Sequence, residues 1–186
     1  CKILDIGILF IGTLVMLEKS KKDSINYINK IEFTDAKVVN ATSEHAGYLQ
    51  HHLRPTDIRE CMIVGASPWA ALHEPLRDPN GKTWTIIIKN QPCAMFGVSD
   101  ISFDKEYRSA VIWLLGSNLC EEEPLKFCRV TKRIIDMLLI DYDVLENLVP
   151  VDHTKTIKWL NWLGFQFAKE STTINGFQCV RFVRCN

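Results

Sequence analysis

Apolar and polar positions alternate along most of the chain in two periods, one typical of strands and one typical of helices. Short runs rich in β-branched and aromatic residues predict strands. Longer stretches with apolar residues three and four apart predict helices. The predicted strands are 37–41, 83–88, 92–98, 109–115, 143–149, 165–167 and 177–183, and the predicted helices are 43–53, 58–64, 69–74, 125–141 and 153–163.

The clearest helical pattern lies near the end of the chain, in residues 153–165. Ile157, Leu160 and Leu163 recur at helical spacing and form one apolar stripe. Gly164 stands where a left-handed residue closes a helix. Strand patterns lie on both sides of this helix, so the last third of the chain is predicted to form a strand–helix–strand unit.

Punctuating residues divide the other elements. Ser43 is expected to cap the first of the predicted helices, and either Thr56 or Asp57 the second. Gly and Asn clusters predict tight connections at 89–91 and 174–176 and a turn at 78–81, while 100–108 forms a polar connection. With the short helix 69–74 and the short strand 165–167 left out, the predicted order from residue 37 is β-α-α-β-β-β-α-β-α-β.

The first 33 residues do not follow this pattern, and we expect them to form an extension before one domain at 34–186. Residues 17–34 predict a short helix or linker. The apolar run 3–15 contains Asp5 and is shorter than the roughly 20 residues of a membrane-spanning helix. It fits translated sequence upstream of a start at Met16, a packed extra element or, as the third interpretation, a membrane anchor.

Composition narrows the function classes. The 186 residues contain 22 basic and 22 acidic side chains, and this balance gives no sign of non-specific nucleic-acid binding. The seven cysteines show neither C-x-x-C nor zinc-site spacing, so we expect reduced cysteines and no metal site.

Four separated segments carry a family resemblance: 54–60 (RPTDIRE), 92–97 (PCAMFG), 112–117 (IWLLGS) and 159–165 (WLNWLGF). The last one and the predicted element order resemble the GNAT N-acetyltransferase superfamily over residues 37–185. Together the four resemble the GNAT-like internal virion proteins of short-tailed phages. The resemblance implies an α+β fold in α/β/α layers, with a mixed, mostly antiparallel central sheet flanked by helices.

The GNAT resemblance also implies a place for acetyl-CoA, between the central strand and the strand after the long helix. By position, the cofactor-binding candidates are Leu114, Leu115, Gly116, Ser117, Asn118, Arg129, Lys132 and Arg133. The family's glycine-rich phosphate loop corresponds here to a stretch whose only glycine is Gly116 and which contains Glu121, Glu122 and Glu123. Carboxylates at this place repel anionic phosphates.

The catalytic equipment that the resemblance implies also departs from the family pattern. The position of the usual proton-donating tyrosine holds Leu160, and His153 takes the place of the usual asparagine. His153 and Glu60 are the candidate bases, because imidazole and carboxyl groups can accept a proton near neutral pH. Further candidates with structural alternatives are the bases Asp57, His73 and Asp152 and the cleft aromatics Trp113, Trp159 and Trp162.

Two functions follow from these residues. One is a non-catalytic or degenerate internal virion or assembly protein on the GNAT fold, with other phage proteins as partners, located in the host cytoplasm or the virion. The alternative is an active acetyl-CoA-dependent N-acetyltransferase acting on an amine. A membrane-tethered accessory role rests only on residues 3–15.

Overall fold

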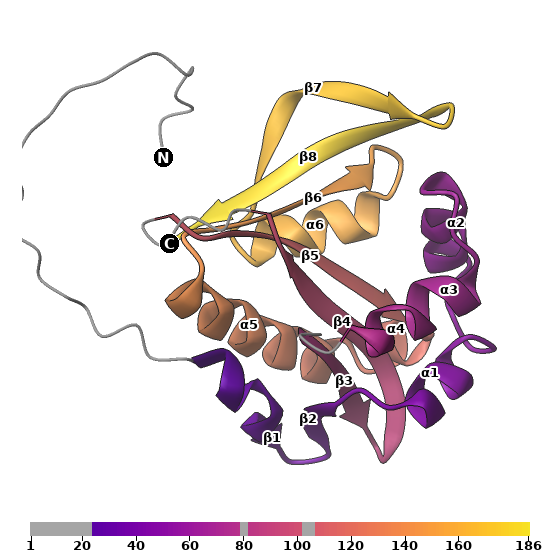
Figure 1. Cartoon of the computed structure of the whole chain (residues 1–186), viewed down its shortest axis with the longest axis vertical. Helices are drawn as coiled ribbons and strands as arrows, with labels where there is room; N and C mark the ends of the chain where they lie inside the picture. The colour runs from indigo at the N-terminus through magenta and orange to yellow at the C-terminus, as the bar shows by residue number, and fades with distance from the viewer. Residues whose placement is uncertain (1–23, 79–81, 102–106) are drawn as a thin grey trace, which may run out of the picture.

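The structure, a computed structural model, describes residues 24–78, 82–101 and 107–186. Its centre is an eight-stranded sheet in the order β1-β2-β3-β4-β5-β6-β8-β7 (Figure 1). All neighbours are antiparallel except β5 and β6, which are parallel. The strands are β1 Glu32–Phe33, β2 Ala36–Asn40, β3 Lys82–Ile88, β4 Gln91–Asp100, β5 Ser109–Gly116, β6 Val144–Pro150, β7 Gln166–Ile174 and β8 Phe177–Cys185.

Helices cover both faces of the sheet, as expected for the layered α+β class. One hydrophobic cluster joins the sheet to the 3-10 helix η1, the long helix α5 and helix α6. A second, smaller cluster joins the other face to α1, α2 and α3. The helices are η1 Ser24–Lys30, α1 Ser43–Leu49, α2 Pro55–Ile63, α3 Pro68–His73, η2 Pro75–Arg77, α4 Leu119–Glu122, α5 Pro124–Asp141 and α6 Thr154–Trp162.

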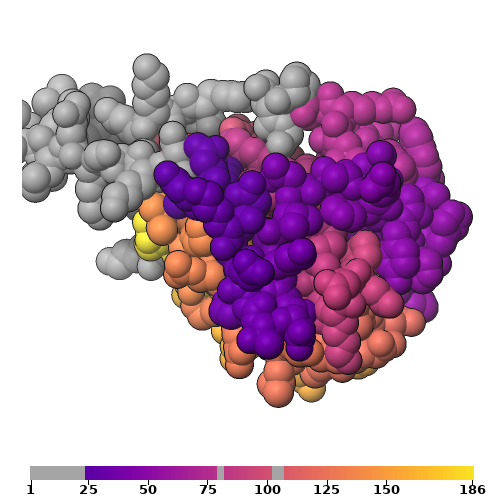
Figure 2. All heavy atoms as spheres, turned by 90° about the horizontal axis from the view of Figure 1, so that it is seen from below, coloured from indigo at the N-terminus to yellow at the C-terminus, as the bar shows by residue number. Residues whose placement is uncertain are grey.

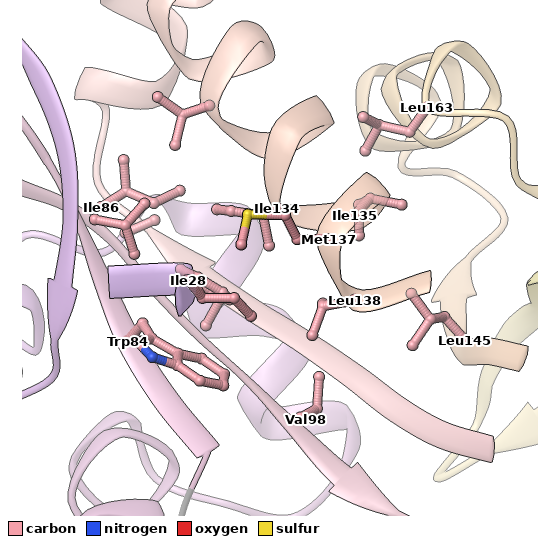
Figure 3. Packing of buried hydrophobic residues seen from close by; sticks show 14 of the residues in the cluster. Ile28, Trp84, Ile86, Val98, Ile134, Ile135, Met137, Leu138, Leu145 and Leu163 are labelled. Carbon is pink, nitrogen blue, oxygen red and sulfur yellow. The ribbon is translucent and has the colours of Figure 1, made fainter. Parts of the chain in front are cut away.

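Residues 24–33, expected from the sequence to precede the domain, pack into its main core. Ile28 is fully buried and lies among Trp84 of β3 and side chains of α5 (Figure 3). The Ser24 hydroxyl donates to Asp141 at the end of α5 over 2.6 Å, and the same carboxylate accepts the Ile25 N–H. This indigo segment spreads over the lower face of the molecule (Figure 2). Within the described residues, the packed domain therefore includes 24–33.

The expected N-caps of the first two α-helices are wrong, by one residue for α1 and by two or three for α2. Thr42 caps α1 through a hydrogen bond from the His45 N–H, because Ser43 is already helical. The second helix begins at Pro55, whose fixed φ suits the first helical position, so Thr56 and Asp57 lie inside it. The Asp57 carboxylate is thereby released for a contact elsewhere in the fold.

Two-residue turns connect both predicted hairpins. Lys89 and Asn90 have φ values of 51° and 61°, and Asn175 and Gly176 have values of 46° and 85°. Positive φ at both central residues is typical of the type I′ turn, which matches the twist of the flanking strands. Expectations at 1–23, 79–81 and 102–106, including the alternatives for residues 3–15 and Met16, lie outside the described residues.

Helix α6 ends as its sequence predicts. Gly164 has a φ of +89°, and the N–H groups of Gly164 and Phe165 donate to the carbonyls of Asn161 and Leu160. This pair of bonds is the Schellman closure of a helix. It turns the chain so that Phe165 enters the core and packs edge-on against Phe182, with ring centroids 5.2 Å apart.

The parallel pair β5–β6 is short and then opens. It is aligned only at Ser109–Val144, Ala110–Leu145 and Val111–Glu146. Beyond these residues β5 stays paired with β4, while β6 follows β8. The two strands diverge from their common start and leave a wedge in the sheet (Figure 1).

Candidate functional site

The narrow end of the wedge is held by one side chain. The Asn147 Nδ2 donates to the Ile112 carbonyl of β5 over 2.6 Å, and its Oδ1 accepts the Leu148 N–H over 2.7 Å. The amide thus satisfies one backbone group on each strand at the point where their ladder stops. Asn147 fixes where the cleft begins.

We expect Asn147→Leu, which keeps the approximate size, to destabilise the protein by about 1–3 kcal/mol, because both backbone groups lose a partner. Urea unfolding followed by tryptophan fluorescence measures the change. The matched control is Asn161→Leu at an exposed position of α6. Its free energy of unfolding is expected to lie within about 0.5 kcal/mol of the wild-type value. Equal effects of the two substitutions would show that Asn147 does not join the strands in solution.

The wide end of the β5 edge is closed by residues from α2. The Gly116 N–H donates to Asp57 Oδ1 over 3.0 Å, and the Gly116 carbonyl accepts the Arg54 N–H over 2.9 Å. The Arg54 guanidinium holds the same carboxylate through two bonds, from Nε over 2.6 Å and from Nη2 over 3.0 Å. Asp57 is almost completely buried. The first backbone donor at the end of β5 therefore already has an anionic partner from the protein itself.

Between these two ends the wedge forms a cavity of about 920 Å³. Its walls are mainly apolar side chains of β5, β6, α5 and α6, and it reaches polar residues of α2. Trp113 and Trp159 line it, whereas Trp162 is exposed and lies outside the lining. Leu160, at the position of the family's tyrosine, is buried in the wall.

The structure brings the two candidate bases together in this cleft. His153, the residue before α6, shares a hydrogen bond of 2.7 Å between its Nδ1 and Glu60 Oε1 of α2. Burial, reinforced by the negative charge of Asp57, raises the pKa of the Glu60 carboxyl against the opposing effect of His153. The His153 Nε2 is itself buried and has no partner among the described residues. A carboxyl group bound to an imidazole is an arrangement found in general bases, but the His153 Nε2, which would accept the proton, is buried away from solvent.

Acidic residues occupy α4 and the N-cap of α5, where a GNAT cofactor's phosphates would dock. Lys155 holds the pKa of Glu121 below its usual range, and Lys89 with Lys126 does the same for Glu123, so these carboxylates stay ionised. Negative groups stabilise a helix N-terminus as a bound phosphate does. With Gly116 as the only glycine near this turn and its N–H in use, the residues present do not fit a pyrophosphate.

Of the other residues proposed for cofactor binding, two line the cleft and five do not. Leu114 and Leu115 line the cleft. Ser117 is buried, and both its N–H and its hydroxyl donate to the Cys93 carbonyl, while Asn118 is exposed before α4. The three basic candidates on α5 lie outside the cleft lining: Arg129 lies over the Phe33 ring, Lys132 pairs with Asp136, and Arg133 is exposed.

The remaining candidate bases have structural partners. His73 stacks on Trp69 within α3, with ring centroids 5.0 Å apart. Asp152 pairs with Arg59 on the surface over 2.7 Å. Two residues that shape the cleft, Asn147 and Arg54, were not singled out by sequence reasoning. Asn147 offers a signal in retrospect, because Glu146 and Asn147 are the polar residues in the otherwise apolar strand β6, and the pairing with β5 stops there.

Comparison with solved structures places this fold in a known class. The architecture is that of the GNAT acetyltransferases. A putative acetyltransferase superposes with a TM-score of 0.63 at 12% identity, covering 83% of this chain and 88% of the other. An acetyltransferase of the GNAT family from Bacillus anthracis gives 0.63 at 7% identity, covering 83% and 97%. RimL, a ribosomal L7/L12 alpha-N-protein acetyltransferase in complex with coenzyme A, gives 0.61 at 12% identity, covering 82% and 95%.

A sequence comparison adds a second, more particular likeness. The model of a family described as "Bacteriophage T7, probable scaffold protein Gp13" matches residues 107–172. This range includes β5, α5, β6 and α6, the elements that enclose the cleft. The resemblance to the GNAT fold and the link to phage proteins, both drawn from the sequence, are confirmed. A search of curated proteins gave no match.

One further expectation concerns membranes. Within the ranges that the structure describes, no helix is both long enough and apolar enough to cross a bilayer.

Proposed function

We propose that this chain is a non-catalytic phage assembly or internal virion protein that uses the GNAT fold as a scaffold. The observation that carries the proposal is the closed phosphate end of the cleft. Asp57 accepts a hydrogen bond from the Gly116 N–H, and ionised glutamates occupy α4 and the N-cap of α5. A cofactor with several phosphate charges would have to displace or approach these carboxylates. The phage scaffold family matched at 107–172 supports an assembly role, with other phage proteins as partners in the host cytoplasm or the particle.

Isothermal calorimetry with acetyl-CoA tests the loss of cofactor binding. We expect no saturable heat at millimolar ligand, since carboxylates within a Debye length of the docking place repel the phosphates. A GNAT enzyme that binds acetyl-CoA serves as the positive control. A dissociation constant in the micromolar range would contradict the proposal.

The assembly role has its own test. Mass spectrometry of purified particles and of assembly intermediates, from cells infected by a phage that encodes this chain, is expected to detect the protein. If the protein is absent from both the particles and the assembly intermediates, the proposed assembly role is wrong.

The Glu60–His153 pair favours a second function, an active N-acetyltransferase. A carboxylate bound to Nδ1 orients an imidazole for proton transfer at its other nitrogen, provided that Nε2 becomes accessible. Coenzyme A bound to RimL shows what a neighbour of the same fold holds. In this second function acetyl-CoA would supply the acetyl group, and the calorimetry above separates the two functions.

A further inference from the structure

Three residues of β5 direct backbone groups toward the wedge. Ile112 and Gly116 have hydrogen-bond partners there, and Leu114 has none among the described residues. In an extended strand the backbone N–H and C=O of alternate residues point to the same side. Gly116 points away from β4, toward Asp57 and Arg54, so Leu114 and Ile112 point the same way. The Ile112 carbonyl accepts from Asn147. No hydrogen-bond partner on this side is found for the Leu114 backbone among the described residues, and Leu114 is partly exposed.

We propose that this gap binds an extended, apolar peptide segment of a partner protein, whose backbone pairs with Leu114 and whose side chains enter the cleft. The inference deepens the proposed function by naming how an assembly protein would use the wedge. Addition of a strand to an open sheet edge supplies main-chain hydrogen bonds, and pockets for the alternating side chains supply specificity.

Charge in the cleft favours an uncharged occupant. The charged groups that line it are already engaged. The pairs are Arg54 with Asp57, Glu121 with Lys155, Glu60 with His153, and Asp152 with Arg59. The remaining lining is mainly apolar, from residues such as Ile112, Ile134 and Leu148. A ligand with phosphates would meet Glu121 and its neighbours, whereas a peptide group offers Leu114 the N–H and the C=O that it lacks.

The probe is a pool of capped heptapeptides, with Lys at each end and five central residues drawn from Ala, Val, Leu, Ile and Phe. Titration into the ¹⁵N-labelled protein is expected to shift the Leu114 amide resonance. The same pool with all five central residues N-methylated lacks the amide donors, and we expect its apparent affinity to be at least tenfold lower. A pool drawn from Ser, Asn, Gln and Glu is expected to leave Leu114 unshifted.

Two variants test the place of binding. Leu148→Lys puts a charge into the apolar lining and is expected to weaken binding of the apolar pool at least tenfold. Ile140→Lys makes the same change at an exposed position of α5 outside the lining, and it is expected to have no effect. A dispersed amide spectrum of each variant shows that it is folded.

The inference is overturned if the apolar pool leaves Leu114 unshifted, or if N-methylation and Leu148→Lys do not change its affinity. Acetyl-CoA is titrated in parallel. If acetyl-CoA shifts Leu114 and the peptides do not, both the peptide site and the non-catalytic function fail. If neither binds, the peptide site alone is refuted and the assembly role stands.

Discussion

Asp57→Ala is expected to reduce the free energy of unfolding by about 3–5 kcal/mol, since it leaves a buried charge without its partner. The Asp57 carboxylate accepts two bonds from the Arg54 guanidinium and one from the Gly116 N–H. Its loss strands both donors in a part of the cleft wall that water reaches poorly. Urea unfolding followed by tryptophan fluorescence measures the loss, with an unchanged dependence on urea concentration as evidence that the transition is the same.

Asp152→Ala is the matched control. Asp152 also pairs with an arginine, Arg59, at 2.7 Å, but both side chains are well exposed, at 56% and 39%. Exposed ion pairs contribute about 0–1 kcal/mol. If Asp57→Ala costs no more stability than Asp152→Ala, the end of β5 is not closed by Asp57 in solution.

A double variant separates the charge from the backbone contact. In Arg54→Met with Asp57→Asn, the asparagine oxygen can still accept the Gly116 N–H, and no charge remains unpaired. We expect this double variant to lose less stability than Asp57→Ala alone. If the double variant lost as much free energy of unfolding as Arg54→Met and Asp57→Asn lose in sum, the two residues would act independently.

The sequence predicted most of the fold, because its strongest signals are local. The hairpin turns, the long helix and the end of α6 each depend on residues a few positions apart, and each forms within a residue or two of its expected place. Ile25, Ile28 and Ile31 also repeat every third residue, the period of the 3-10 helix that η1 forms. From the sequence, residues 17–34 are interpreted only as a short helix or linker that precedes the domain.

The cleft was predictable only in outline. The GNAT resemblance implied a binding place between β5 and β6, and the structure has a cleft there, beyond the short pairing of the two strands. The contacts that shape the cleft join residues far apart in sequence: Asp57 with Gly116, Asn147 with Ile112, and Glu60 with His153. Glu60 and His153 were each proposed from residue type and position. The hydrogen bond between them could not be predicted, because no local feature of the sequence sets the distance between two elements far apart in the chain.

The Leu-Gly-Phe end of α6 carries the second large effect. We expect Phe165→Ala to destabilise the protein by about 3–5 kcal/mol, because the ring is almost fully buried and its removal leaves a cavity against Phe182. Phe182 and Leu160 also line the cleft, so the packing of Phe165 supports one of its walls. Urea unfolding gives the energy, and the Leu114 amide resonance reports whether the wall has moved.

Trp162→Ala is the control for this prediction. Trp162 stands three residues earlier on the same turn and is also aromatic, but it is 54% exposed. Surface substitutions away from caps and buried networks stay within about 0.5 kcal/mol. Phe165→Leu, which fills most of the space, should cost less than Phe165→Ala. If alanine at 165 and at 162 were equally tolerated, Gly164 would close the helix without directing Phe165 into the core, and the cleft wall would need another support.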